Sequence, residues 1–420
     1  MQSHNEEIAA ITSNRRRVTF ENTIAALERS GSDLARVQRV FSALASSATN
    51  DDIRAIQREM SPRLAAHASA IALNEDLFAR IDRLQKRASR LNLSAEQKRV
   101  LERIHTNFLR AGAELVGEDR ARLAEITERL ASLYTTFSQN VQKDAEASVL
   151  VLDSDADKAG LPSTVLSAAA QAASDRGMEG KHVITLARSS FEPFMTFSTR
   201  RDLREQVFSA WTNRGDNENE FDNAGIIRDI LKLRLERAQM LSFDNFAAFR
   251  TANTMAGTPE AAHDLLAQVW EGAIAKAERE AAQIVDVMDD EKAAHDLQPW
   301  DWWHYAEKAR KRFYDFDEDA VKAHLTLDNV LRAQFAVAER LFGVTFEERD
   351  DIPVYHPDVR VWEVRSAAGE PMGLFYGDYF ARPGKRSGAW KSALRSQSKI
   401  DGRVLPLIMN NCNYNKAAPG

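Results

Sequence analysis

The chain has 420 residues, of which 44% are hydrophobic and 28% charged, a composition typical of folded globular proteins and not of disordered ones. This length predicts two or three domains. The formal net charge is −6, and the longest basic run is Arg15-Arg16-Arg17, which argues against a nucleic-acid-binding surface. No segment contains the roughly 18 to 20 consecutive apolar residues that cross a bilayer, so we expect no membrane partner.

The cysteine content and the first residues of the chain indicate in which cellular compartment the protein is expected. Cys412 is the single cysteine, so no disulfide can form within the chain, which fits a reducing environment. The opening segment MQSHNEEIAAITSN has no basic stretch followed by an apolar one, as a secretory signal would have. We therefore expect a cytoplasmic protein.

Residues 1–145 are predicted to form an N-terminal region of antiparallel helices. Apolar side chains recur at steps of three and four residues from 123 to 141, which places them on one face of a helix. Ser94 and Gln97 have the spacing of a capping box, so another helix should begin there and continue through Leu109.

Residues 146–200 are predicted to form a small mixed segment. The apolar run from Val149 to Val151 and the β-branched run HVITL at 182–186 favour a minor strand pair within 149–197. Gly160-Leu161-Pro162 is typical of a turn that precedes another helix.

Residues 201–343 form a second predicted helical region. Thr258 followed by Pro259 indicates an N-cap and the start of a long alanine-rich helix. Pro299 is predicted to begin another helix. Its aromatic residues would cover much of the circumference of that helix, so we expect them to pack in the core: Trp300, Trp302, Trp303 and Tyr305.

Residues 344–420 change to a strand-like period and are predicted to form a small sheet. Valines alternate around 359–364, a turn follows at 367–370, and 373–380 suits the second strand of a hairpin. Residues 404–409 are a third candidate strand. The fold class is thus mainly α, a multi-helix shell with a small sheet near the C-terminal end.

A search for catalytic residues finds no complete site. No two of the nine histidines are four residues apart, so the sequence contains no His-Glu-x-x-His zinc motif, and it contains no Gly-x-Ser-x-Gly motif and no P-loop. Glu102-x-x-His105 and Glu260-x-x-His263 leave open a di-metal carboxylate centre, although ordinary surface or core roles fit both pairs.

The segment YGDYFARPGKRSGAW, residues 376–390, is the most unusual part of the chain. It follows a predicted strand, contains three glycines and is basic. Glycines beside a strand allow another chain's backbone to approach closely, whereas a plain hairpin loop with a solvated basic tip explains the composition equally well.

Short stretches throughout the chain resemble one enzyme family. The matching stretches, in order, are TFENTIAALERSG from Thr19, RLAEITERLASLYTTFSQNV from Arg122, AGLP from Ala159, FSTRRDLREQVFSAWTNRG from Phe197, MAGTPE from Met255, PWDWWHYAEKARK from Pro299, LFGVTFEE from Leu341, HPDVRVWEV from His356, YGDYFARPGKRSGAW from Tyr376 and NNCNYNK from Asn410. Together they resemble the M3 family of zinc oligopeptidases, especially the dipeptidyl carboxypeptidase and oligopeptidase A group.

The resemblance implies a helical shell around a deep channel that admits short peptides, with a small sheet whose edge receives the substrate as an added strand. On this chain it implies an edge at 373–380 or at the strand reaching Gly388-Ala389-Trp390. The substrate-edge candidates are Phe375, Tyr376, Asp378, Arg382, Lys385, Gly388, Ala389 and Trp390.

The same resemblance implies a zinc cofactor in the family enzyme, held by a helix that follows the position of residue 420. We therefore expect this chain to be the N-terminal and central part, cut before that helix, to bind no zinc and to be inactive by itself. Its expected partners are short peptides and the missing C-terminal catalytic part. The alternative is a non-catalytic helical module that binds peptides or another protein.

Overall fold

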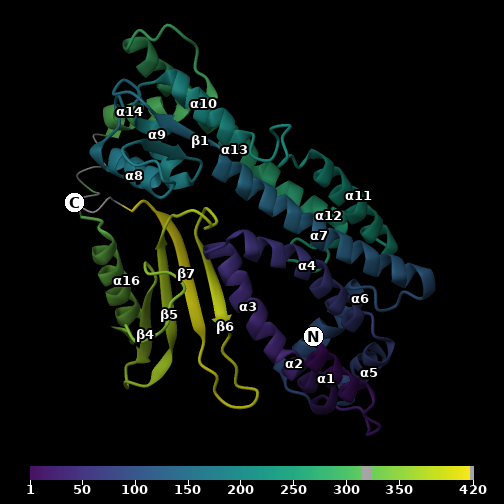
Figure 1. Ribbon diagram of the computed structural model, residues 1–420. Helices are drawn as coiled ribbons and strands as arrows, with labels where there is room; N and C mark the ends of the chain where they lie inside the picture. Colours follow the sequence, from purple (N-terminus) through teal and green to yellow (C-terminus); the bar gives the residue numbers. More distant parts are fainter. Residues whose placement is uncertain (315–320, 322–323, 417–420) are drawn as a thin grey trace.

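The computed structural model describes residues 1–314, 321 and 324–416. These residues form a mainly helical molecule with two small sheets, which confirms the predicted fold class. Figure 1 shows a group of N-terminal helices, an upper body crossed by long helices, and a separate sheet that lies beside helix α3.

The N-terminal region is helical, as predicted. Its elements are α1 (Gln2–Thr12), a π-helical turn (Glu21–Ala25), α2 (Ala26–Arg29), α3 (Ser32–Ser47), α4 (Asp51–Ala72), α5 (Glu75–Gln85), a 3₁₀ turn (Ala88–Arg90), α6 (Ala95–Arg110) and α7 (Gly117–Ala147). The capping box of Ser94 and Gln97 is present at the start of α6. In α7 the predicted stripe is buried through Leu123, Ile126, Leu130 and Leu133. Part of it packs on α11 (Ala224–Met240) through Ile230.

The predicted strand pair is also confirmed. Strands β1 (Val149–Leu152) and β2 (His182–Thr185) pair antiparallel, with Val149 opposite Thr185. Helix α8 (Ser163–Ser174) lies between them in the sequence, and residues 191–197 are part of a helix, α9 (Arg188–Phe197), in spite of Pro193.

Aromatic side chains hold the upper body together. Its further elements are α10 (Arg201–Thr212), α12 (Phe246–Thr251), α13 (Pro259–Asp290), a 3₁₀ turn (Pro299–Asp301) and α14 (Trp302–Tyr314). Trp300 and Trp303 pack against the core that contains Phe191 and Phe194, whereas Trp302 and Tyr305 pack against the end of α13. The predicted core role of this cluster is confirmed.

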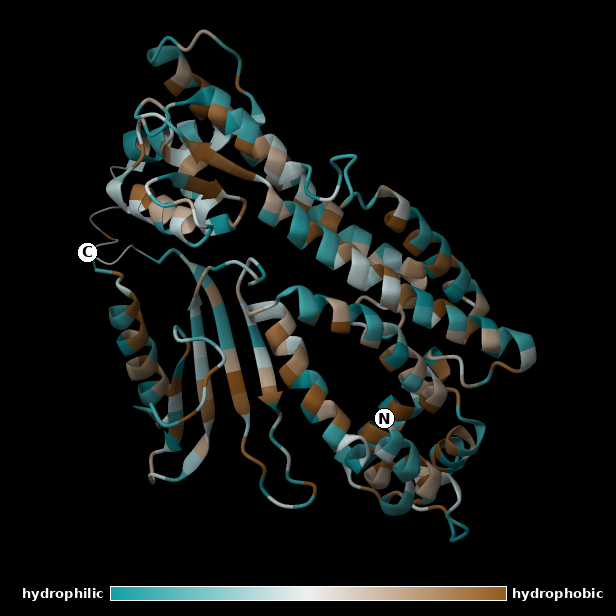
Figure 2. Ribbon diagram, viewed as in Figure 1, coloured by the Kyte–Doolittle hydropathy of each residue, from teal (hydrophilic) through white to brown (hydrophobic). Residues whose placement is uncertain are grey.

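The N-terminal half of α13 lies on the surface. Its apolar side chains at helical spacing are exposed: Leu266 by 69%, Val269 by 63%, Trp270 by 66% and Ile274 by 41%. The start of the helix is as predicted, because the Thr258 hydroxyl accepts a hydrogen bond from the Ala261 N–H. Figure 2 shows brown apolar segments along several of the long helices of the upper body.

The larger sheet has five strands in the order β3-β4-β5-β7-β6. Their bounds are β3 (Val344–Glu348), β4 (Arg360–Ser366), β5 (Pro371–Phe380), β6 (Trp390–Arg395) and β7 (Leu407–Tyr414). The predicted hairpin is β4 with β5, whereas the third predicted strand begins later than expected, at Leu407, and runs parallel to β5.

Both faces of this sheet are covered, because successive side chains of a strand point to opposite faces. Val361, Tyr376 and Met409 pack with Ala43 of α3 on one face. On the other face, Trp362 and Tyr379 pack against α16 (Leu327–Phe342), which ends at Gly343 as predicted.

Candidate functional site

A cleft of about 1840 Å³ lies where the three parts of the molecule meet. Its walls come from α3, α4, the C-terminal half of α7, α8, the loop at 381–387 and strand β6. Figure 1 shows α8 and α7 above this region, with β6 and α3 beneath. Ligand pockets for small molecules usually measure about 300 to 1000 Å³, so the cleft is large enough for a longer ligand.

The loop at 381–387 is fastened to the end of α3 by backbone hydrogen bonds. The Thr49 N–H donates to the Gly384 carbonyl at 2.8 Å, and the Arg386 N–H donates to the Ser46 carbonyl at 2.8 Å. Gly384 has φ +76°, and a Cβ atom there would lie 2.4 Å from the Thr49 oxygen. Only glycine therefore allows this approach.

Asp378 anchors the same loop from inside the sheet. Its carboxylate is fully buried and accepts hydrogen bonds from both Nη atoms of Arg382 at 2.7 Å, from Lys385 Nζ at 2.8 Å and from the Tyr355 hydroxyl. Arg382 Nη2 also donates to the Ser47 carbonyl at 2.7 Å. Burial acts to raise the pKa of Asp378, but these hydrogen bonds outweigh it and lower the pKa below its ordinary value.

The opposite wall is fixed by an ion pair between α4 and α7. Arg54 donates two hydrogen bonds to Glu146, at 2.9 and 2.8 Å, and Gln139 donates to the Arg54 carbonyl at 3.0 Å. Both bonds come from the Nη2 atom of Arg54, and such charge-assisted hydrogen bonds are stronger than neutral ones. Helices α4 and α7 therefore form one rigid side of the cleft.

Buried Asp144 of α7 orders the loop that follows α10. Its carboxylate accepts from the Gly215 N–H at 2.7 Å and from the side-chain amides of Asn217 and Asn219 at 2.7 and 2.9 Å. These donors lower its pKa, although burial acts in the opposite direction. The loop in turn positions Arg214, which lines the cleft.

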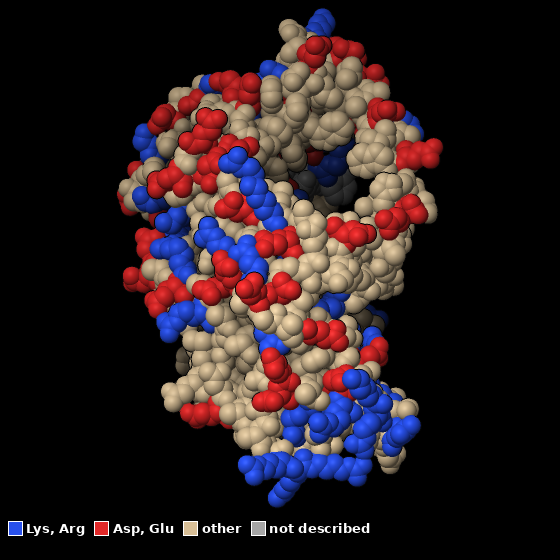
Figure 3. Space-filling model, turned by 90° about the vertical axis from the view of Figure 1, so that its right-hand side faces the viewer, with Lys and Arg blue, Asp and Glu red and all other residues tan. Residues whose placement is uncertain are grey.

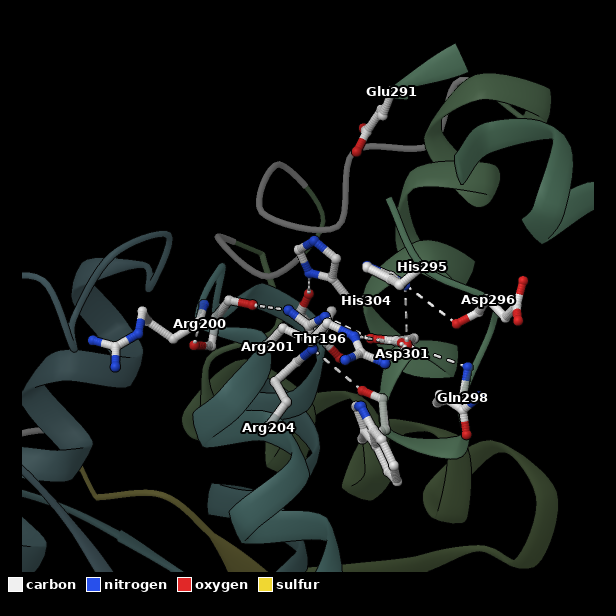
Figure 4. A network of polar contacts seen from close by, with 12 residues as sticks. Thr196, Arg200, Arg201, Arg204, Glu291, His295, Asp296, Gln298, Asp301 and His304 are labelled. Carbon is white, nitrogen blue, oxygen red and sulfur yellow. Dashed lines mark hydrogen bonds and ion pairs between the residues drawn. The ribbon is translucent and has the colours of Figure 1, made fainter. Parts of the chain in front are cut away.

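A second buried carboxylate, Asp301, lies away from the cleft in the upper body. Figure 4 shows it between Arg201 and Arg204 of α10. Arg204 Nη2 donates at 2.9 Å and Arg201 Nε at 3.1 Å, while the Gln298 N–H donates at 3.2 Å. Nearby, His304 Nδ1 contacts the Thr196 carbonyl at 3.0 Å, and burial lowers the pKa of His304 to about 4.

The predicted substrate-edge residues separate into two groups. Arg382, Lys385 and Trp390 line the cleft. The other five do not: Phe375, Tyr376 and Asp378 lie on β5, whereas Gly388 and Ala389 are exposed in the loop before β6.

Strand β5 lies between β4 and β7, and this corrects the expectation of an edge at 373–380. Its backbone groups are already paired on both sides, so no further strand can be added there. In the described sheet, β6 is the outer strand next to β7. It begins at Trp390, whereas the resemblance implied a strand that leads into Gly388-Ala389-Trp390.

The two Glu-x-x-His pairs do not form a common metal centre. His105 of α6 faces Asp82 of α5 at 3.4 Å, whereas His263 of α13 is 80% exposed. Within the described residues, no three His, Cys, Asp or Glu side chains are grouped as metal ligands would be. The di-metal hypothesis is therefore wrong for these residues.

Comparisons with known proteins agree with the resemblance. The sequence profile of peptidase family M3 matches residues 194–420. The chain belongs to peptidase family M3. It is 39% identical over 421 residues to a dipeptidyl carboxypeptidase of Escherichia coli, 30% identical over 408 residues to oligopeptidase A of the same organism, and 24% identical over 440 residues to a thimet-like oligopeptidase of Dictyostelium discoideum.

These alignments cover 100%, 96% and 99% of the chain but 62%, 60% and 62% of the respective relatives. The chain therefore spans about three fifths of the length of the M3 proteins that it matches. Among the described helices, none is both long and apolar enough to cross a membrane.

Proposed function

We propose that these residues form the peptide-binding part of a metallopeptidase of the oligopeptidase and dipeptidyl carboxypeptidase type. The observation that carries this proposal is the cleft of about 1840 Å³, bordered by the outer strand β6 and by the joined helices α4 and α7. An extended peptide beside β6 would pair its backbone with the unpaired edge, which binds many sequences with little selectivity. Membership of family M3 supports peptides as the ligand.

In this proposal, this chain binds the peptide and a zinc-bearing polypeptide hydrolyses it. The family resemblance implies zinc as the group that polarises the scissile carbonyl and activates water. The described residues do not fit such a site, because they offer no group of three potential ligands. We therefore propose that this 420-residue chain binds peptides but does not cleave them by itself, and that the zinc-bearing polypeptide of a family enzyme is its partner.

Calorimetric titration with an unstructured nine-residue peptide tests the binding role. Ala172→Trp places a large side chain on the α8 wall of the cleft and should abolish binding. Ser174→Trp is the matched control, because Ser174 is exposed on the same helix and does not line the cleft. Unchanged binding by the Ala172→Trp variant would refute the assignment of the cleft.

Elemental analysis and mass spectrometry of peptide mixtures test the second part. We expect the chain to retain no stoichiometric zinc after dialysis and to leave the peptides intact. Tightly bound zinc together with hydrolysis would show that the chain cleaves peptides by itself. The assignment of binding and hydrolysis to separate polypeptides would then be wrong.

A non-catalytic peptide-binding module is the second candidate. The lack of a metal-ligand group within the described residues favours it. The two candidates differ in one measurement, the hydrolytic activity gained when the C-terminal third of a dipeptidyl carboxypeptidase is added. A gain supports the enzyme part, and binding without any gain supports the module.

A further inference from the structure

The charge of the cleft differs in sign from that of the whole protein. Eight lysines and arginines line it against three acidic residues, an excess of five positive charges, whereas the chain carries a formal net charge of −6. On the face in Figure 3 acidic and basic side chains are intermingled, mainly on the left, and Lys and Arg gather at the lower end. The basic lining of the cleft is thus opposite in sign to the net charge of the chain.

The three acidic side chains of the lining already have partners. Glu146 is held by Arg54, Asp358 by Lys416, and Asp175 accepts a hydrogen bond from Gln171 at 2.7 Å. Among the cations, Arg382 and Lys385 share the single carboxylate of buried Asp378, and Lys416 pairs with Asp358.

Five cations remain without a carboxylate within 4.0 Å among the described residues. They are Arg39 of α3, Arg176 after α8, Arg214 after α10, Arg386 of the loop and Lys391 of β6.

Arg176 and Arg214 are the most informative of these. Both are half-buried, and each guanidinium is oriented by one backbone carbonyl: Arg176 Nη1 donates to Ala172 at 2.9 Å, and Arg214 Nε donates to Trp211 at 2.8 Å. Arg214 also stacks 4.7 Å from the Trp211 ring centroid. Burial lowers the pKa of both groups and outweighs the opposite influence of nearby carboxylates, which are Asp175 and Glu146 for Arg176 and Asp144 for Arg214; none of them forms an ion pair with either arginine within 4.0 Å. Each guanidinium is partly desolvated and retains N–H groups that donate no hydrogen bond within the described residues. A guanidinium in this state binds carboxylates well.

The opposite side of the cleft carries Arg386 and Lys391. Arg386 lies 4.5 Å from the Trp390 ring centroid, and its backbone N–H is held by Ser46, so its position is fixed from two directions. Lys391 is exposed on the outer strand. A peptide lying along β6 would therefore have unpaired cations on both sides.

We propose that this cleft selects peptides with carboxylate side chains, which Arg176 and Arg214 bind from one wall and Arg386 and Lys391 from the other. This inference rests on the proposed peptide-binding function and adds a substrate class to it. Partly buried charges interact more strongly than those in bulk water, so the selection is expressed mainly at the two half-buried arginines. The two exposed cations mainly accelerate association.

Calorimetric titration of the 420-residue chain with three unlabelled nine-residue peptides tests the inference. One is neutral with an amidated end, one has three Glu replacements and an amidated end, and one is neutral with a free C-terminal carboxylate. We expect the Glu peptide to bind about tenfold more tightly than the amidated neutral one at 50 mM salt, with the preference largely lost at 500 mM, where screening is within about 5 Å.

Arg176→Met and Arg214→Met remove the charge and keep the apolar stem of the side chain. Each should weaken binding of the Glu peptide by about three- to tenfold and leave binding of the amidated neutral peptide within about twofold. Arg17→Met, an exposed arginine outside the cleft lining, is the matched control and should change neither.

Three outcomes contradict different claims. Equal affinity for the Glu and amidated neutral peptides overturns the inference and leaves the peptide-binding function intact. If only the free-terminus peptide gains affinity, the arginines recognise the chain end, and the side-chain selection is overturned. If no peptide binds the unmodified chain, the proposed function itself fails.

Discussion

Two fully buried carboxylates, Asp378 and Asp301, have similar chemistry and different surroundings. Each accepts hydrogen bonds from two cationic side chains and lies in a part of the molecule closed to water. The partners of Asp301 come from α10 and the turn before α14, so the network joins neighbouring elements of the upper body. The network of Asp378 extends through Arg382 to the end of α3, more than 300 residues away in the sequence.

The two networks should therefore differ in their effect on ligand binding. Removing either carboxylate leaves buried cations without a counter-charge, so both changes should destabilise the fold. Of the two networks, only that of Asp378 borders the cleft, so only its loss should also weaken ligand binding.

Asp378→Ala should have the largest effect. It leaves Lys385 fully buried and Arg382 mostly buried without a carboxylate, which costs about 3–5 kcal/mol of the free energy of unfolding. The loop at 381–387 should also lose its position, so peptide affinity should fall. Urea unfolding and titration of the same sample measure the two effects.

Asp301→Ala should destabilise the chain somewhat less, by about 2–4 kcal/mol, because the Arg201 side chain is 32% exposed and can be rehydrated. Peptide affinity should stay within about twofold of the unmodified chain, since the network does not line the cleft. If this variant lost peptide affinity as completely as Asp378→Ala does, the separation of the two networks would be wrong.

The free energy of unfolding should depend on pH through His304, which lies near the Asp301 network. His304 has a folded pKa of about 4 because of burial, below the ordinary 6.5 of the unfolded chain. The unfolded state therefore binds the proton first, and stability should fall as the pH drops from about 6.5 to 4, by about 2–3 kcal/mol from this residue.

His304→Gln should flatten the unfolding free energy over that window, whereas His263→Gln, at an 80% exposed position, should not. Burial lowers the pKa of His4, His67, His182 and His356 too, so the slope is reduced and not abolished. The lowered pKa values of Asp378 and Asp301 act in a different window. Their contribution is present above the unfolded pKa near 3.9 and is lost as the pH falls through the lower folded values.

Tyr355→Phe should have the smallest effect. It removes one hydrogen bond to Asp378, worth about 1 kcal/mol, while the two cations remain. Tyr379→Phe is a matched control, since the Tyr379 hydroxyl is buried on the same strand as Asp378 and makes no hydrogen bond within the described residues. A loss of stability in the control equal to that of Tyr355→Phe would contradict this account of the hydroxyl.

Much of the helical fold is predictable from local signals. The capping box at Ser94, the Thr258-Pro259 start and the glycine after α16 are all present where spacing alone predicted them. The sheet is less predictable. Strand β6 lacks a clear alternation of apolar and polar residues, because an outer strand is only partly covered. Strand β7 pairs directly with β5, although β6 lies between them in the sequence.

The candidate site is also only partly predictable from the sequence. Its glycines and basic residues distinguish the segment 376–390 in the sequence. No local spacing shows that Asp378 would be buried between Arg382 and Lys385, or that Arg176 and Arg214 would line the same cleft. Those relations depend on packing between segments that lie far apart in the chain.

The backbone hydrogen bond between Thr49 and Gly384 has a consequence for synthesis on the ribosome. Roughly 330 residues must be translated after Thr49 before its acceptor exists, and chain segments fold as they emerge. Helices α3 and α4 can form early, but this hydrogen bond can fix their orientation relative to the sheet only after Gly384 has been translated. Nascent chains shorter than about 390 residues therefore lack one wall of the cleft.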